Sequence, residues 1–168
     1  MSKLSVVIPA WNEQEGIGPV IRRILQIGRA RWAKAGISAL EILVVDDGST
    51  DGTAQVVTQA ATAARQHRAC VRLIRHDTNC GYGAALQTGF AEATGDLLAF
   101  LDADSTYPPE SLPALCQALQ TSGPALVIGN RMSQPFSGMP ALRWLGNVFF
   151  ARLAGLLAGV PVADCSSG

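Results

Sequence analysis

Short apolar runs alternate along this chain with longer segments in which apolar residues recur every three or four positions. The first pattern is typical of buried strands and the second of amphipathic helices. The short runs predict strands at residues 4–8, 41–45, 71–74, 97–101 and 126–128. The spaced patterns predict helices from an N-cap at Asn12 to about residue 36, and at residues 53–66, 83–93, 109–120 and 142–158. This alternation predicts an α/β fold, with a mainly parallel sheet and helices on both of its faces.

The composition limits the kinds of protein that this chain can be. A chain of 168 residues can bury one sizeable core, so a single domain over residues 1–168 is expected. Apolar residues make up 48% of the chain, which excludes a disordered protein, and a net charge of zero indicates no nucleic-acid partner. The four cysteines form no Cys-x-x-Cys pair, which argues against a zinc site and suits reduced thiols in the cytoplasm.

The apolar run at residues 97–101 ends in two carboxylates, Asp102 and Asp104. Pro108 and Pro109 follow, and they cannot extend a central strand. Residues two apart in extended backbone point to the same side, so both carboxylates can face one point. Two close anions repel unless a cation lies between them, and oxygen ligands favour Mg²⁺ or Mn²⁺. The alternative is a polar turn in which the two acids only satisfy backbone donors.

The other predicted strands also lead into polar or small residues. Trp11 and Glu13 follow the first strand and offer an aromatic face and a carboxylate. Asp46 and Asp47 follow the second and can accept hydrogen bonds from a base or a ribose. Residues 79–85 follow the third, and their backbone amides could approach a phosphate. Ligands bind at the carboxyl ends of such strands, so these groups together predict a site for a nucleoside diphosphate.

Six motifs in order resemble one known family. The chain is similar to family 2 glycosyltransferases of the GT-A fold, and more closely to the polyprenyl-phosphate glycosyltransferases, the group that includes dolichol-phosphate mannosyltransferase. The motifs are VIPAWNE (7–13), VVDDGSTDGT (44–53), residues 79–86 with Gly89, ATGD (93–96), DAD (102–104) with PPE (108–110), and IGNR (128–131). One such motif would be weak evidence, but six in order make coincidence improbable.

The resemblance implies roles for individual residues. Asp102 and Asp104 match the metal-binding pair, and Asp104 is also a candidate catalytic residue. Thr106 stands where many relatives have a further ligand, Gln, so a water could complete the metal shell. The resemblance implies donor-binding roles, Asp102 included, for Pro9, Trp11 (usually Tyr), Glu13, Val45, Asp47, Arg131 and Arg143.

The resemblance also implies a reaction. A sugar passes from a GDP- or UDP-sugar to a polyprenyl phosphate, with inversion of the anomeric centre and with Mg²⁺ or Mn²⁺ as cofactor. Such enzymes serve cell-envelope biogenesis at the cytoplasmic face of a membrane, so the full-length protein is expected to be peripheral to the membrane or anchored there. A phosphate acceptor is already ionised near neutral pH, so no general base is strictly required.

The last residues of the chain contain one more candidate site residue, Asp164. Asp164 matches the family's Asp-x-x-Ser-Gly motif and is the candidate for a base or an acceptor-positioning group, although it could simply cap a turn. Because family members continue beyond this motif, we expect the catalytic domain to be truncated at Gly168. Two other functions stay open, namely transfer to a saccharide or other hydroxyl acceptor, and a non-catalytic nucleotide-binding module. A dinucleotide-dependent oxidoreductase is poorly supported, because residues 81–83 lack the third glycine of its fingerprint.

Overall fold

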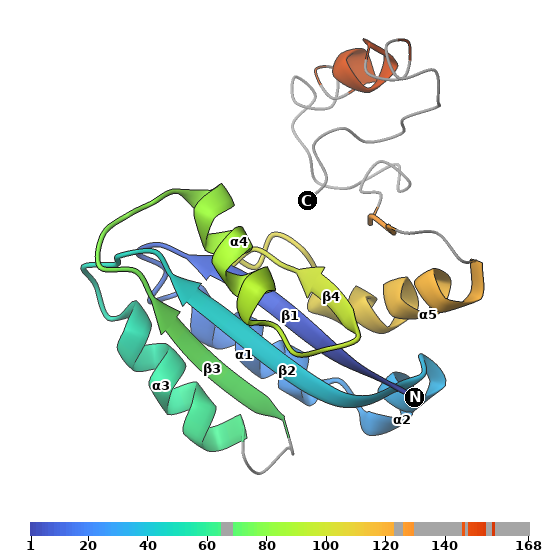
Figure 1. Cartoon of the computed structure of the whole chain (residues 1–168), viewed down its shortest axis with the longest axis horizontal. Helices are drawn as coiled ribbons and strands as arrows, with labels where there is room; N and C mark the ends of the chain where they lie inside the picture. Colours follow the sequence, from blue (N-terminus) through green and yellow to red (C-terminus); the bar gives the residue numbers. More distant parts are fainter. Residues whose placement is uncertain (65–68, 123–125, 130–145, 147, 154–155, 157–168) are drawn as a thin grey trace. The chain divides into compact units, whose positions relative to one another are not determined.

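The computed structural model describes residues 1–64, 69–122, 126–129, 146, 148–153 and 156. Its chain divides into two units, Met1–Ala125 and Leu126–Gly168. The first unit holds a parallel sheet in the order β3-β2-β1-β4 (Figure 1). The strands are β1 (Ser2–Ala10), β2 (Ile37–Asp46), β3 (Cys70–Arg75) and β4 (Leu97–Phe100). The predicted parallel α/β sheet is therefore confirmed.

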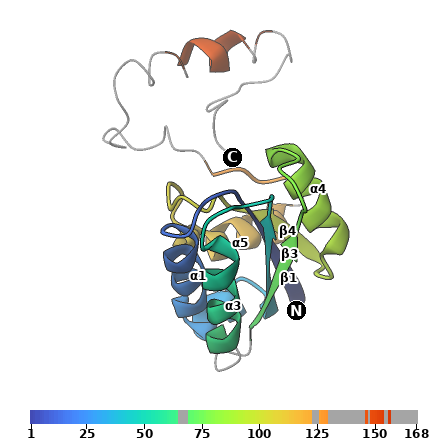
Figure 2. The same cartoon turned by 90° about the vertical axis from the view of Figure 1, so that its left-hand side faces the viewer.

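Helices cover both faces of this sheet, as predicted. They are α1 (Ile17–Gln26), α2 (Arg29–Lys34), α3 (Thr53–Ala64), α4 (Tyr82–Glu92) and α5 (Leu112–Ser122), the last preceded by the 3-10 turn η2 (Pro109–Ser111). Figure 2 shows α4 on one face and α1 and α3 on the opposite face.

The alternation of side chains along the strands explains these two layers. Val6 and Ile8 of β1 point into a core shared with α1, α2 and α5. Val7, between them, points to the other face and packs with Ala85 of α4. Successive side chains of a strand point to opposite faces, so a continuous apolar run is what a sheet covered on both sides requires.

Three sequence predictions about elements are wrong. Asn12 is no N-cap, because its φ of 55° is left-handed and α1 begins five residues later, at Ile17. The single helix predicted to residue 36 is broken at Ile27, where an extended backbone (ψ 118°) separates α1 from α2. Residues 126–128 form no strand; Leu126 and Ile128 are 68% and 53% exposed, so they lack the pairing and burial that a strand needs.

The second unit contains part of the helix predicted at residues 142–158. Its described residues in that range, namely 146, 148–153 and 156, are all helical. Phe149 and Phe150 are exposed and pack edge to face against each other. Among the described residues, no helix has the length and apolar character needed to cross a bilayer.

Candidate nucleotide and metal site

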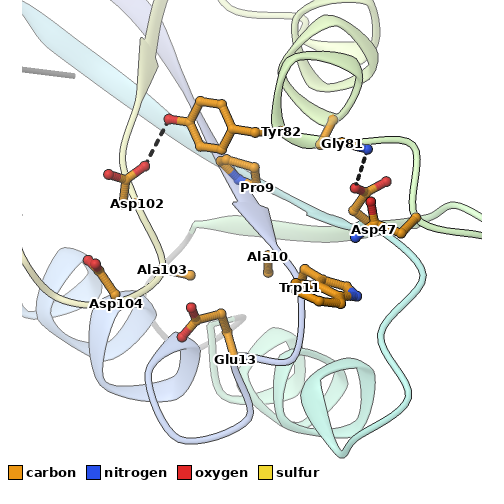
Figure 3. Close-up of a pocket in the computed structure, with 12 residues that line it drawn as sticks. Pro9, Ala10, Trp11, Glu13, Asp47, Gly81, Tyr82, Asp102, Ala103 and Asp104 are labelled. Carbon is orange, nitrogen blue, oxygen red and sulfur yellow. Dashed lines mark hydrogen bonds between the residues drawn. The ribbon is translucent and has the colours of Figure 1, made fainter.

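A pocket of about 520 Å³ lies at the carboxyl ends of the strands. The end of β1 and the loop after it contribute Pro9, Ala10, Trp11 and Glu13, and Asp47 follows β2. The segment that leads into α4 contributes Asn79, Gly81, Tyr82 and Ala85, and the loop after β4 contributes Asp102, Ala103 and Asp104. Side chains from four separate segments therefore meet around one cavity (Figure 3).

The loop after β1 is fixed by hydrogen bonds to the loop after β2. The side chain of Asn12 accepts a hydrogen bond of 2.9 Å from the Thr50 N–H, and the backbone N–H of Asn12 donates to the Ser49 hydroxyl at 2.9 Å. The Glu13 N–H donates to the Thr53 hydroxyl at 2.9 Å. These contacts hold Trp11 and Glu13 at the pocket, and more than half of the Trp11 side chain is open to solvent.

Besides Asp47, three carboxylates line the pocket, those of Glu13, Asp102 and Asp104. Burial, and then the negative charges of Asp104, Asp51 and Asp102, raise the pKa of Glu13. A cation bound between these carboxylates would reduce the repulsion that raises the pKa of Glu13. Carboxylate oxygens are hard ligands and suit Mg²⁺ or Mn²⁺ in kind. The ligand atoms of these three residues do not all lie within 4.8 Å of one another, so holding one ion with all three would require their side chains to move.

The loop that carries the two aspartates also has the features of a polar turn. The Thr106 N–H donates to Asp104 Oδ1 at 2.8 Å, and Ser105 has a left-handed φ of 64°. One carboxylate oxygen of Asp104 thus shapes its own loop. Thr106, the candidate further ligand, is exposed and does not line the pocket.

Asp47 is nearly fully buried and fixes the turn before α4. It accepts hydrogen bonds from the Cys80 N–H at 2.9 Å and the Gly81 N–H at 2.8 Å, and His76 Nδ1 lies 2.6 Å from its Oδ1. Burial alone would raise the pKa of Asp47, but these hydrogen bonds outweigh it and hold the pKa below its usual range. Asp47 therefore organises the pocket wall as well as lining it.

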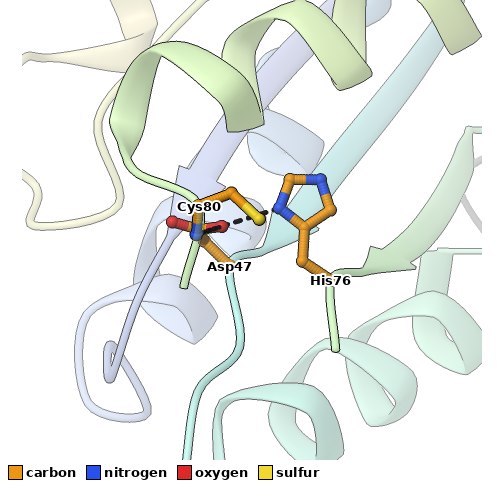
Figure 4. A group of neighbouring side chains, drawn as sticks. All are labelled: Asp47, His76 and Cys80. Atoms are coloured by element: carbon orange, nitrogen blue, oxygen red, sulfur yellow. Dashed lines mark hydrogen bonds and ion pairs between the residues drawn. The ribbon is translucent and has the colours of Figure 1, made fainter. Parts of the chain in front are cut away.

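The side chains of Asp47, His76 and Cys80 lie close enough together to be compared with a metal site (Figure 4). Their hydrogen bonds argue against that use, because His76 Nε2 lies 2.9 Å from the Thr88 hydroxyl and Cys80 Sγ lies 3.4 Å from the Thr78 carbonyl oxygen. The group is better described as a hydrogen-bonded brace between β2, β3 and α4.

Comparison with known proteins identifies the family. The family model described as "Glycosyl transferase family 2" matches residues 5–149. The chain belongs to this family. Its predicted GT-A fold is also confirmed, because solved glycosyltransferases superpose on it.

Curated family members resemble the chain over part of their length. Undecaprenyl-phosphate 4-deoxy-4-formamido-L-arabinose transferase from Sodalis glossinidius is 43% identical over 117 residues, which are 70% of this chain and 33% of that protein. The enzyme of the same name from Klebsiella pneumoniae subsp. pneumoniae is 43% identical over 115 residues, 68% of this chain and 33% of that protein. The chain thus spans about a third of the length of these relatives.

Two solved structures of glycosyltransferases show the same fold. The mannosyltransferase PcManGT from Pyrobaculum calidifontis, in complex with GDP-Man and Mn²⁺, has a TM-score of 0.59 and 28% identity over 76% of this chain and 34% of that chain. Glucosyl-3-phosphoglycerate synthase from Mycobacterium tuberculosis, in complex with Mn²⁺, UDP-Glc and phosphoglyceric acid, has a TM-score of 0.53 and 27% identity over 71% of this chain and 40% of that chain.

Most of the family positions predicted from the sequence lie in the pocket, but not all. Pro9, Trp11, Glu13, Asp47, Asp102 and Asp104 line it. Val45 is fully buried in the core beneath α4 and is not among the lining residues. Arg131, Arg143 and Asp164 lie outside the described residues.

The structure differs from the sequence predictions for this site in three respects. Asp46 is fully buried and accepts hydrogen bonds from the Ser49 N–H and from Arg75, so it is occupied within the protein. The amides of Cys80 and Gly81, expected to be free for a phosphate, donate to Asp47 instead. Tyr82 was not predicted as a site residue, because its position at the start of α4 gives no sign that its hydroxyl reaches Asp102 at 2.8 Å.

Proposed function

We propose that this protein transfers a sugar from a nucleotide-sugar to a polyprenyl phosphate, with inversion of the anomeric centre. The observation that carries the proposal is the pocket in which an aromatic face, Trp11, lies with the carboxylates of Glu13, Asp102 and Asp104. The named activity of the relatives on undecaprenyl phosphate supports the acceptor class. The nucleotide-sugar complexes of the structural neighbours support a GDP- or UDP-sugar donor.

Each lining residue then has a chemical task. Trp11 provides a surface on which the base can stack, and Glu13 can accept a hydrogen bond from the base or ribose. Asp102 and Asp104 would hold Mg²⁺ or Mn²⁺, which supplies positive charge for the leaving diphosphate. Arg131 and Arg143 are proposed to add further positive charge on the donor side.

The proposal for the acceptor is supported by the chemistry of a phosphate monoester and by the sequence motif that contains Asp164. A phosphate monoester is largely dianionic at neutral pH, since its second pKa is about 6, so it can attack without a strong base. Asp164 is proposed to position the acceptor or to act as a base. Because a polyprenyl chain is held in a bilayer, the reaction is proposed to take place at a membrane, and the resemblance to the family suggests its cytoplasmic face.

Binding measurements test the donor and metal part of this proposal. Asp104→Asn should abolish the Mn²⁺-dependent part of GDP or UDP binding in titration calorimetry while leaving the thermal midpoint nearly unchanged. Asp77→Asn is the matched control, because Asp77 is an exposed acid that does not line the pocket. Unchanged metal-dependent affinity in Asp104→Asn would refute the metal assignment.

Product analysis tests the acceptor. Incubation with radiolabelled GDP- and UDP-sugars should place label on undecaprenyl phosphate and not on soluble saccharides. Label on saccharides alone would favour a hydroxyl acceptor. Nucleotide binding without transfer to either acceptor, measured on the full-length protein, would favour a non-catalytic module.

A further inference from the structure

Tyr82 connects two sides of the pocket that come from different strands. It is the first residue of α4, and its ring lines the cavity (Figure 3). Its hydroxyl donates a hydrogen bond of 2.8 Å to Oδ1 of Asp102, at the carboxyl end of β4. About half of the Tyr82 side chain is exposed, so the residue contributes little to the core. Tyr82 therefore contributes to the pocket more than to the packing of the protein.

The backbone that carries Tyr82 is held firmly from the opposite side. Gly81, the residue before it, has a left-handed φ of 93° that an L side chain rarely adopts. The N–H groups of Gly81 and Cys80 both donate to the buried carboxylate of Asp47. The start of α4 is therefore fixed to the end of β2, and the direction in which the Tyr82 ring leaves the helix is fixed with it.

The hydrogen bond from Tyr82 occupies Oδ1 of the Asp102 carboxylate and does not involve Oδ2. Among the described residues, no hydrogen bond to Oδ2 of Asp102 is present. A carboxylate whose one oxygen is held by a hydroxyl has lost most of its freedom to rotate, and its second oxygen can still bind a cation. Partners of this kind orient metal ligands in many proteins, and their loss typically weakens metal binding about 10- to 100-fold.

We propose that Tyr82 is a positioning residue for the metal-binding carboxylate of Asp102, an inference that rests on the proposed function. The chain of contacts runs from Asp47 through the amides of Cys80 and Gly81 to the Tyr82 hydroxyl and Asp102. The end of β2 thus sets the orientation of a metal ligand at the end of β4. Tyr82 acts on the metal through Asp102 and does not itself bind the metal.

Binding of Mn²⁺ in the absence of nucleotide tests this role directly. Free Mn²⁺ is counted by electron paramagnetic resonance in titrations of the wild-type protein, Tyr82→Phe and Asp104→Asn. Tyr82→Phe keeps the ring and removes only the hydroxyl, so we expect the Kd for Mn²⁺ to rise about 10-fold. Thr58→Val is the matched control, because it removes an exposed hydroxyl on α3 whose one hydrogen bond within the described part of the chain goes to the Ala54 carbonyl oxygen, and its Kd should equal that of the wild type.

The outcomes separate the two proposals. If the wild type binds Mn²⁺ and Asp104→Asn does not, while Tyr82→Phe binds as the wild type or more tightly, the inference about Tyr82 is overturned and the proposed metal site stands. If the wild type binds no Mn²⁺, or Asp104→Asn binds it equally well, the proposed metal site itself fails. If Tyr82→Phe leaves Mn²⁺ affinity unchanged and weakens only GDP or UDP binding at saturating Mn²⁺, the hydroxyl contacts the donor and the positioning role is wrong.

Discussion

Ser5 of β1 and Glu41 of β2 face each other in the sheet, and the Ser5 hydroxyl donates a buried hydrogen bond of 2.6 Å to the Glu41 carboxylate. The Thr94 N–H and hydroxyl donate to the same oxygen at 3.0 Å each. The cations of Lys3 and Arg72 lie 3.6 Å from its other oxygen. Burial opposes ionisation of this carboxyl, but the hydrogen bonds of Ser5 and Thr94 and the charge of Lys3 lower its pKa to about 2.

This lowered pKa predicts a loss of stability in acid. Because the folded-state pKa of Glu41 lies below its ordinary value of 4.5, the ionised carboxylate stabilises the folded state in full above pH 4.5. This stabilisation is lost as the pH falls from about 4.5 towards 2. The difference corresponds to about 3 kcal/mol of unfolding free energy. Glu41→Gln should therefore lower the stability measured by urea unfolding by about 2–3 kcal/mol at pH 7, and by about half as much at pH 3.

Glu92→Gln is the control for Glu41. Glu92 also pairs with Arg72, at 2.8 Å, but its side chain is 53% exposed. Exposed ion pairs contribute little, so this variant should change stability by less than about 1 kcal/mol at either pH. Equal losses at pH 7 and pH 3 for Glu41→Gln would contradict the linkage.

The packing of Gly16 against Ala103 leads to a second prediction. A Cβ at Gly16 would lie 2.6 Å from the Ala103 carbonyl oxygen, in the loop between Asp102 and Asp104. Gly16→Ala must therefore shift that loop or α1, and we expect a loss of about 1–3 kcal/mol in unfolding free energy. Mn²⁺ affinity should fall as well.

Gly28→Ala provides the comparison for Gly16. A Cβ at Gly28 has no atom within 4 Å among those that the structure describes, so this variant should keep its stability within about 1 kcal/mol. Calorimetric unfolding and Mn²⁺ titration of both variants check the prediction. Wild-type Mn²⁺ affinity in Gly16→Ala would show that the loop tolerates the shift.

The gathering of acids at one edge of the sheet could be predicted because it follows from topology. Glu13, Asp47 and Asp102 each follow an apolar run that reads as a strand, and parallel strands place their carboxyl ends together. The two faces of the sheet could be predicted for the same reason, since a run such as residues 4–8 is apolar at every position but Ser5.

What the sequence did not predict depends on contacts between distant segments. The side chain of Asn12 has an N-cap's chemistry, but it accepts a hydrogen bond from the Thr50 N–H, 38 residues away. The backbone N–H of Asn12 donates to the Ser49 hydroxyl, 37 residues away. Asp47 could equally serve a ligand or the protein, and only the turn at Cys80 shows that its oxygens serve the protein. Nothing in the local pattern around Tyr82 marks its hydroxyl as a partner of Asp102.

Asp47 carries the third prediction. Its two oxygens accept from two N–H groups and face His76, whereas an asparagine has one acceptor oxygen and would turn an NH₂ group towards a donor. Asp47→Asn should therefore cost about 1–3 kcal/mol of unfolding free energy, and it should weaken nucleotide binding because the turn before α4 loosens. The exposed variant Asp77→Asn should do neither.

Acid should reduce the difference between Asp47→Asn and the wild type. The pKa of Asp47 is below its usual range, so its ionic contribution is present above the usual value and is lost as pH falls through the folded-state value. Unfolding by urea at several pH values from 3 to 7 measures this convergence. A difference that grows in acid would contradict the account of Asp47 as an ionised acceptor.

Trp11 supplies the last prediction. Its side chain is 55% exposed at the pocket, so Trp11→Ala should change the free energy of unfolding by less than about 0.5 kcal/mol. Stacking of a base on an aromatic ring is worth about 1–3 kcal/mol, so the same variant should bind GDP or UDP about 10- to 100-fold more weakly, as calorimetry at saturating Mn²⁺ can measure. Trp11→Tyr should restore most of the affinity, because it restores an aromatic face.

Two comparisons make the result for Trp11 specific. Leu98→Ala removes a half-exposed apolar side chain on β4 that does not line the pocket, and it should leave nucleotide affinity unchanged. The affinity of Trp11→Ala for Mn²⁺ alone should equal that of the wild type, because the indole offers no metal ligand. If Trp11→Ala binds the nucleotide as tightly as the wild type, the base does not stack on this residue, and the donor must enter the pocket in another orientation.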